Sequence, residues 1–97
     1  METLTNAEIR NLKGMAQRIK PIFHVGKSGV TPEFVSGLEE ALKQKELVKI
    51  KFSDFKEEKY ELAEQIAQRT ASHLITVLGH VAVFYRKKPV ADTVAKK

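Results

Sequence analysis

The tetrapeptide GKSG at residues 26–29 has the composition of an anion-binding loop. Glycines let a backbone turn sharply and approach another molecule closely, and Lys27 adds a positive charge. Thr31 and Pro32 follow, and they are typical of a helix start, because threonine caps free amides and proline suits the first helical position. A helix start also carries unpaired N–H groups and the positive end of a dipole. The sequence therefore predicts a phosphate site here, with Ser28 as a hydroxyl donor.

This loop resembles the end of the phosphate-binding loop of NTPases, but the rest of that motif is missing. The motif requires a glycine five residues before its second glycine, where this chain has Pro21. The intervening residues are strand-like and leave no room for a phosphate cradle. Nucleotide hydrolysis is therefore not expected.

Metal and nucleophilic chemistry also lack support in the sequence. The three histidines, His24, His73 and His80, share no metal-ligand spacing, and the chain has no cysteine. Nothing in the sequence pairs Ser28 with a base. His24 fits either a contact to a base or phosphate, or an ordinary position at a strand end. The sequence predicts a protein that is not an enzyme and has no cofactor, metal or small-molecule substrate.

The charge distribution favours a polyanionic partner. Lysine and arginine number 17 and acidic residues 12, for a net charge of +5 in 97 residues. Residues 9–32 hold five basic side chains and no acidic one, namely Arg10, Lys13, Arg18, Lys20 and Lys27. A basic balance of this kind is typical of nucleic-acid binding, although a basic protein without such a partner is the alternative.

Length and composition predict one cytoplasmic domain. Ninety-seven residues with 42% hydrophobic content suffice for one compact core. The absence of cysteine fits a reducing compartment. No apolar run approaches the ~20 residues that span a bilayer. The first residues lack the pattern of a signal peptide. We expect a monomer in the cytoplasm.

The first predicted helix begins with a capping box formed by Thr5 and Glu8. Pro21 is expected to end it, because the residue before a proline avoids helical geometry. Apolar residues recur behind the cap at helical spacing: Ile9, Leu12, Met15, Ala16 and Ile19. A second, polar stripe contains Arg10, Lys13, Gln17 and Lys20. This stripe is either a binding face or a solvated surface.

A second helix is predicted after the GKSG loop, followed by a strand at residues 47–52. The helix stripe contains Val35, Leu38, Ala41 and Leu42, with Phe34 at its margin. In the strand, apolar and basic residues alternate, so that Lys49 and Lys51 point away from the apolar face. This second face is expected to be basic and at least partly open to water.

A third helix and a hairpin complete the predicted domain. Ser53 or Asp54 is expected to cap the helix, whose apolar stripe is Leu62, Ala63, Ile66, Ala67 and Thr70. Its outer side is acidic, with Glu57, Glu58, Glu61 and Glu64, and is expected to face away from a polyanion. Two apolar runs joined by Gly79-His80 predict the hairpin, as inner strands or strands covered by the first helix. Residues 87–97 are predicted to be a loosely ordered basic tail.

The predicted order is α-β-α-β-α-β-β, which makes an α/β (α+β) fold with a four-stranded mixed sheet packed against three helices. Three blocks of this order resemble the hallmark blocks of the CRM domain, named for chloroplast RNA splicing and ribosome maturation. They are residues 22–31, 46–52 and 78–86. The resemblance covers roughly residues 4–86 and includes the YhbY family, the stand-alone bacterial form.

The resemblance implies an RNA-binding protein that associates with precursors of the large ribosomal subunit and assists ribosome assembly. It also implies a fold similar to the C-terminal domain of translation initiation factor three. The family's glycine loop clamps RNA backbone, and it maps onto Gly26, Lys27, Ser28 and Gly29. Residues 1–86 would then form one RNA-binding domain, with the tail outside the shared pattern.

The sequence thus predicts an RNA-backbone site at the loop, extended by a basic surface. That surface is expected to contain Lys13, Lys20, Lys49, Lys51 and Arg86. Phosphate contacts position RNA without reading its sequence. With two tyrosines, no tryptophan and phenylalanines expected in the core, recognition of RNA shape is favoured over base stacking. The alternatives are docking to an acidic ribosomal or assembly protein, and peripheral binding to anionic membranes, for which the first helix lacks an aromatic anchor.

Overall fold

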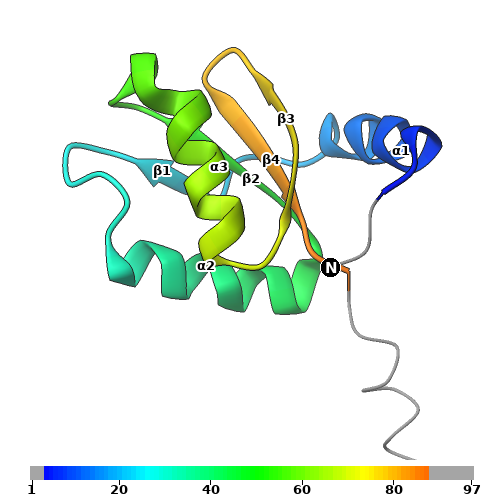
Figure 1. The fold of residues 1–97 in the computed structure, drawn as a ribbon, viewed down its shortest axis with the longest axis horizontal. Helices are drawn as coiled ribbons and strands as arrows, with labels where there is room; N and C mark the ends of the chain where they lie inside the picture. Colours follow the sequence, from blue (N-terminus) through cyan, green and yellow to red (C-terminus); the bar gives the residue numbers. More distant parts are fainter. Residues whose placement is uncertain (1–3, 88–97) are drawn as a thin grey trace, which may run out of the picture.

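The computed structural model describes residues 4–87 and confirms the predicted order of elements (Figure 1). The helices are α1 (Asn6–Ala16), α2 (Pro32–Lys45) and α3 (Lys59–Arg69), with a short 3-10 helix, η1 (Lys56–Glu58), before α3. The strands are β1 (Phe23–Val25), β2 (Leu47–Phe52), β3 (His73–Leu78) and β4 (Val81–Tyr85). Most of the predicted tail lies outside the described residues.

The four strands form one mixed sheet, as predicted, and their order is β1-β2-β4-β3. β1 runs parallel to β2, whereas β4 is antiparallel to both β2 and β3. β4 is therefore an inner strand and β3 an edge strand. The two-residue turn Gly79-His80 joins β3 to β4, and Gly79 has the positive φ of 62° that such turns require.

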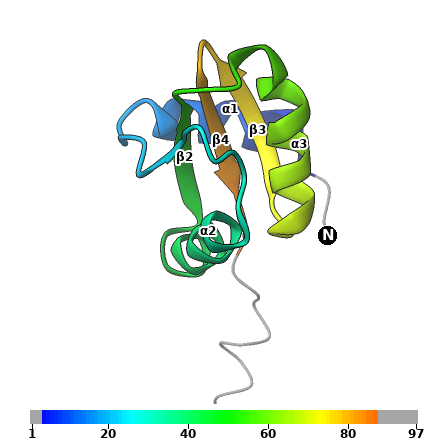
Figure 2. The ribbon, with the colours of Figure 1, turned by 90° about the vertical axis from the view of Figure 1, so that its left-hand side faces the viewer.

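The two faces of the sheet bury separate apolar clusters. Val48, Ile50 and Phe52 of β2 are almost fully buried on the face that packs against α2 and α3. The other face is covered in part by α1, whose Leu12 and Ala16 pack against neighbouring strands. Figure 2 shows α2 and α3 beside the sheet and α1 beyond it. Because α1 covers only part of its face, the lysines of β2 are left near water, as the alternation predicted.

The first helix is shorter than the sequence predicted. It ends at Ala16 rather than at Pro21, and the amides of Gln17, Arg18 and Ile19 donate to carbonyls three residues back. This tighter winding breaks the 3.6-residue period, so the polar stripe does not continue to Lys20. Met15 was expected in the apolar stripe, but its side chain is 47% exposed.

The start of the third helix also differs from the prediction. Neither Ser53 nor Asp54 caps it, because the chain first passes through η1 and α3 then begins without a side-chain cap. Asp54 Oδ1 instead accepts a hydrogen bond from the amide of Phe55, 2.9 Å away. The predicted apolar stripe of α3 is confirmed, since all five of its residues are buried or half-buried. No helix within residues 4–87 is long and apolar enough to cross a membrane.

Candidate nucleic-acid interface

The GKSG loop projects from one end of the molecule, between β1 and α2 (Figure 1). The amide of Gly29 donates to the carbonyl of Gly26 at 3.0 Å, which closes a tight turn. Lys27 and Ser28 occupy the exposed corner of the turn, with negative φ angles. Within the described part of the chain, their amides and side chains have no hydrogen-bond partner. They are available to an external acceptor such as a phosphate oxygen.

The start of α2 contributes less to this site than the sequence predicted. Thr31 caps the helix as expected, and its Oγ1 accepts a hydrogen bond from the amide of Phe34 at 3.0 Å. Pro32 has no N–H, and Glu33 places a carboxylate in the first turn. The capped and acidic helix start is therefore a weak anion site, and the exposed turn has to supply the donors.

Phe55 packs against the loop, a contact that the sequence did not predict. A Cβ atom at Gly29 would lie 3.5 Å from the Phe55 ring, and Gly29 itself has a φ of 71°. Phe55 also has a positive φ, 55°, which is unusual for an aromatic residue. The Phe55 ring thus packs against one side of the turn, although Phe55 is 26 positions further along the chain than Gly29. No local sequence pattern predicts this contact.

Lys51 and His24 lie beside each other on adjacent strands. They are register partners of β2 and β1, and both side chains are exposed. Since partners in a parallel pair share a face of the sheet, both belong to the face opposite α2 and α3. Lys49 lies two residues away on that face and is half-buried, with its Nζ donating to the carbonyl of Ile19 at 3.1 Å.

Lys49 shares a groove with each of two lysines in or near α1. Lys13 and Lys49 line one groove between α1 and the sheet, and Lys20 and Lys49 line another under the connection from α1 to β1. Lys45 also lines the second groove and was not among the predicted residues. The structure therefore brings together four of the predicted lysines, Lys13, Lys20, Lys49 and Lys51, on one side of the sheet.

Arg86 lies apart from these residues. It follows β4, and its amide donates to the carbonyl of Glu46 at 2.8 Å, beside the start of β2. Lys51 and the loop are at the other end of β2. The Arg86 side chain is half-buried, and its Nη1 is enclosed. Its predicted contact with RNA would require a separate part of the surface.

A further basic cluster surrounds the hairpin turn at the loop end of the sheet. The carbonyl of His80 accepts a hydrogen bond from the amide of Phe52 at 2.7 Å, which fixes the turn beside the end of β2. Lys59 Nζ donates to the carbonyl of Gly79 and lies 3.4 Å from His80 Nδ1. Partial desolvation lowers the pKa of His80 from its ordinary 6.5, and the charges of Lys59, Lys56 and Lys51 lower it further. The sequence prediction included only Lys51 of this cluster.

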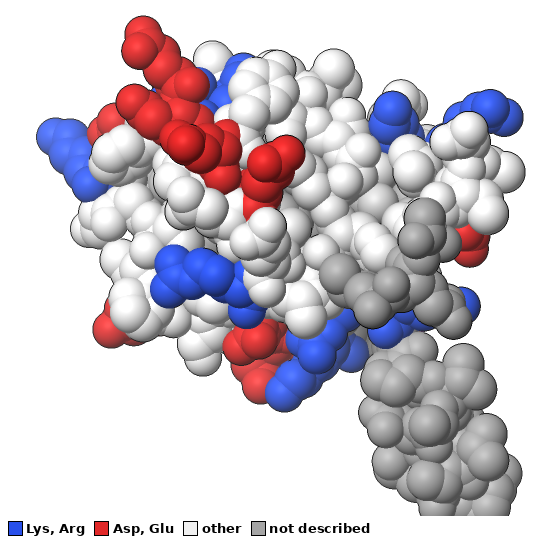
Figure 3. Space-filling model, in the orientation of Figure 1, with Lys and Arg blue, Asp and Glu red and all other residues white. Residues whose placement is uncertain are grey.

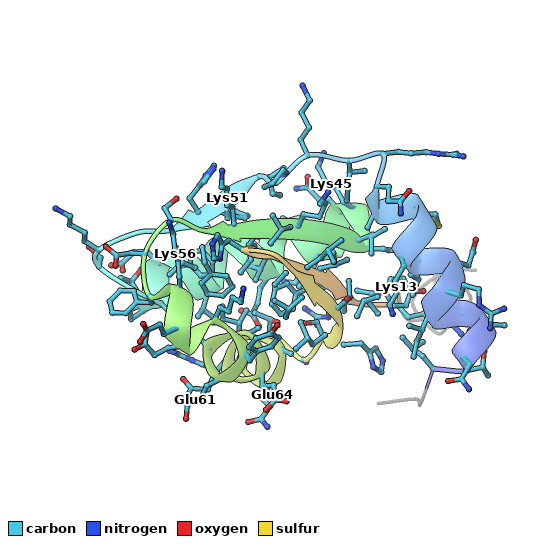
Figure 4. The ribbon with its side chains drawn as sticks, turned by 90° about the horizontal axis from the view of Figure 1, so that it is seen from above. Lys13, Lys45, Lys51, Lys56, Glu61 and Glu64 are labelled. Atoms are coloured by element: carbon cyan, nitrogen blue, oxygen red, sulfur yellow. The ribbon has the colours of Figure 1, made fainter. Side chains whose placement is uncertain are left out.

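The outer side of η1 and α3 is acidic, as predicted for the third helix. Glu57, Glu58, Glu61 and Glu64 are all exposed, and Figure 3 shows acidic side chains gathered over this region. In Figure 4, Glu61 and Glu64 lie on the opposite side of the molecule from Lys45 and Lys51. The molecule thus has a basic side and an acidic side. Within residues 4–87, no group of three or more histidine or acidic side chains is placed to hold a metal ion.

The mixed sheet, its three helices and the glycine loop define a small α+β domain with one basic side. The chain matches the model of the CRS1/YhbY (CRM) domain over residues 4–86. It belongs to this family, as the sequence blocks predicted.

Relatives with similar length extend this match. The chain is 33% identical over 85 residues to the probable RNA-binding protein YqeI of Bacillus subtilis, covering 87% of this chain and 88% of YqeI. It is 31% identical over 87 residues to an RNA-binding protein of Haemophilus influenzae, covering 89% and 88% of the two chains. The solution structure of SAV1595 from Staphylococcus aureus, for which RNA binding has been suggested, has a TM-score of 0.77 and 33% identity, covering 90% and 92%.

Proposed function

We propose that this protein is a non-catalytic RNA-binding protein that contacts RNA backbone through Gly26–Gly29 and the lysines beside it. The observation that carries the proposal is the exposed turn, in which Lys27 and Ser28 present unpartnered donors beside Lys51 and His24. Charge-assisted hydrogen bonds to phosphate suit such donors. The names of the relatives, RNA-binding proteins in two bacteria, support the same partner.

The finer proposal is that the RNA belongs to precursors of the large ribosomal subunit, whose assembly this protein assists in the cytoplasm as a monomer. It rests on the family resemblance. Residues 1–86 would act as one RNA-binding domain, to which the basic residues 87–97 add positive charge. The contact would extend along the sheet through four lysines, Lys13, Lys20, Lys49 and Lys51. Arg86 would contact only an RNA that also reaches the other end of β2.

The test is RNA binding at several salt concentrations, with large-subunit ribosomal RNA and the variant Lys27→Ala. Each lost phosphate contact should reduce the salt slope by about one unit. We expect Lys27→Ala to weaken binding and give a shallower slope. The control is Lys43→Ala, which removes the same charge from the exposed side of α2, where Lys43 lies 3.7 Å from Glu40. Equal slopes for the two variants would move the site away from the loop.

Docking to an acidic ribosomal or assembly protein is a second candidate. An exposed apolar patch among basic residues would favour it, and none was expected from the sequence. The structure places Leu78, 74% exposed, in a groove that Lys13 and Lys49 also line. A complex that forms in cell extract and survives nuclease treatment would favour protein docking, whereas its loss on nuclease treatment would favour RNA.

A further inference from the structure

A groove of about 330 Å³ lies between α1 and the uncovered part of the sheet. Its volume is at the small end of the ~300–1,000 Å³ range of small-ligand sites. Val81 and Val83 of β4 and Ala16 of α1 line it with apolar surface, and Leu78 stands exposed at its edge. An aliphatic surface left open in this way can take up a flat apolar group.

The polar residues around the groove suit an anionic ligand with a mixed hydrogen-bonding edge. Lys13 and Lys49 supply two ammonium groups, and no described residue that lines the groove carries a carboxylate. Gln17 and Thr76 can each donate and accept hydrogen bonds. Within residues 4–87 the side chains of Lys13, Gln17 and Thr76 have no hydrogen-bond or ion-pair partner.

The pairing of the strands connects this groove to the part of the sheet that precedes the GKSG loop. The strand registers place His24, Lys51, Val81 and Leu78 in one row, with His24 two residues before Gly26. Strands lie about 4.8 Å apart, so this row spans roughly 14 Å from β1 to β3. A single RNA strand whose phosphates contact the loop could follow this row and reach the groove with a nucleotide further along the strand.

We propose that this groove binds the base of an unpaired nucleotide, while Lys13, Lys49 and Lys51 contact its flanking phosphates. This inference rests on the proposed RNA-binding function and adds a contact to the base. The aliphatic floor of Val81, Val83 and Leu78 takes the place of an aromatic stacking surface. Gln17 and Thr76 contact the edge of the base.

An unpaired base fits the groove better than an acidic protein segment does. Carboxylates of such a segment need only donors, which the lysines would satisfy, whereas a base edge needs both the donors and the acceptors that Gln17 and Thr76 offer. Paired bases in an RNA duplex turn these edges toward each other. The occupant is therefore single-stranded RNA.

The experiment measures the affinity of the full chain for two probes: a short unstructured RNA strand, and an abasic strand of the same length. The wild type should bind the base-bearing strand about five- to tenfold more tightly. Leu78→Ser should remove most of this difference and leave abasic binding unchanged. Tyr60→Ser is the matched control, because Tyr60 is 61% exposed on α3 and lies outside the groove. Thr76→Val, which keeps the shape and removes the hydroxyl, should lower binding of the base-bearing strand alone.

Equal binding of the two strands by the wild type would overturn the inference, and it is the result expected if the groove docks a protein instead. If Lys27→Ala still weakened binding and reduced the salt slope in that case, the proposed RNA-binding function would stand. A Leu78→Ser variant that behaves like Tyr60→Ser would also overturn the inference. Failure of the wild type to bind either strand would also overturn the inference, whereas the proposed RNA-binding function would be contradicted only if large-subunit ribosomal RNA failed to bind as well.

Discussion

The two glycines of the GKSG loop have different reasons to be glycine. Gly29 has a φ of 71° and faces the Phe55 ring, so a side chain there would be strained in its backbone. Gly26 has no positive φ, and a Cβ atom at this position would meet open space. Gly29 is therefore required by the turn itself, whereas Gly26 leaves surface free for a close approach by another molecule.

Gly29→Ala and Gly26→Ala should consequently separate stability from binding. Gly29→Ala should lower the free energy of unfolding by about 1–2 kcal/mol, the cost of a left-handed backbone in a residue with a Cβ atom. Gly26→Ala should leave that free energy unchanged or raise it by a few tenths of a kcal/mol, because alanine restricts the unfolded chain. It should nevertheless weaken RNA binding. Urea denaturation and RNA titration of both variants measure these effects.

A Gly26→Ala protein that binds RNA as the wild type does would contradict a close approach of RNA backbone at this residue. Equal destabilisation by the two substitutions would contradict the difference between their backbone conformations.

At the scale of elements, the position of α1 decides how much of the sheet remains open. The helix packs through Leu12 and Ala16, and its early end at Ala16 leaves the groove beside Val81 and Val83 uncovered. Its start is fixed by the capping box, in which the Thr5 amide donates to Glu8 Oε1 at 2.8 Å and the Glu8 amide donates to Thr5 Oγ1 at 3.1 Å. Substitutions in this cap should therefore change the stability of α1.

The capping box predicts an acid-sensitive contribution to stability. The hydrogen bond from the Thr5 backbone, followed by the one with its side chain, lowers the pKa of Glu8 from its ordinary 4.5. A carboxyl group whose pKa is lowered on folding stabilises the folded state at pH values above its pKa in the unfolded chain. This contribution is lost as the pH falls through the pKa of the group in the folded protein. Glu8→Gln keeps an acceptor but does not titrate, so its free energy of unfolding should fall less than that of the wild type on acidification below pH 4.5.

Chemical denaturation at neutral and acidic pH measures this difference. The other acidic residues are common to both proteins, so only the difference between the two pH profiles reports on Glu8. Parallel profiles would show that the Glu8 carboxylate makes no pH-dependent contribution.

At the scale of the whole molecule, charge is divided between two sides. The carboxylates of α3 face away from Lys45 and Lys51, which lie on the side of the proposed RNA site (Figure 4). A polyanion would be attracted to one side and repelled by the other, which orients it before contact. The hairpin turn lies at the loop end of the sheet, where Lys51, Lys56 and Lys59 surround His80.

His80 should therefore report the arrival of phosphate at this end of the molecule. Desolvation and three lysine charges hold its pKa below 6.5 in the protein alone. Phosphates that neutralise those lysines should raise the pKa of His80, and binding should then take up protons and strengthen as the pH falls through this range. NMR titration of the imidazole with and without an RNA strand measures the shift.

Lys59→Ala is the control, since it removes one of the three lysine charges near His80 and should raise the pKa of His80 without RNA. An imidazole pKa that RNA leaves unchanged would mean that phosphates do not reach the hairpin, and it would confine the contact to the loop and β2.

The sequence by itself determined the elements and the faces of this protein. The caps at Thr5 and Thr31, the alternation in β2 and the acidic side of α3 are encoded within a few consecutive residues, where helix and strand periods act directly. The predicted C-terminal end of α1 and the predicted cap of α3 were wrong. The tight turns after α1, in which amides donate to carbonyls three residues back, and the left-handed backbone of Phe55 depend on tertiary packing. No local sequence pattern predicts them.

Only the tertiary structure decided which side chains meet. Lys49 contacts the carbonyl of Ile19 from 30 residues away, Phe55 supports Gly29, and Leu78 joins Lys13 at one groove. Arg86, which was predicted to extend the basic surface beside the loop, follows β4 and lies at the opposite end of β2. These relationships follow from strand order and register, which bring distant segments together through burial of both sheet faces. A pattern of spacing along one segment cannot specify them.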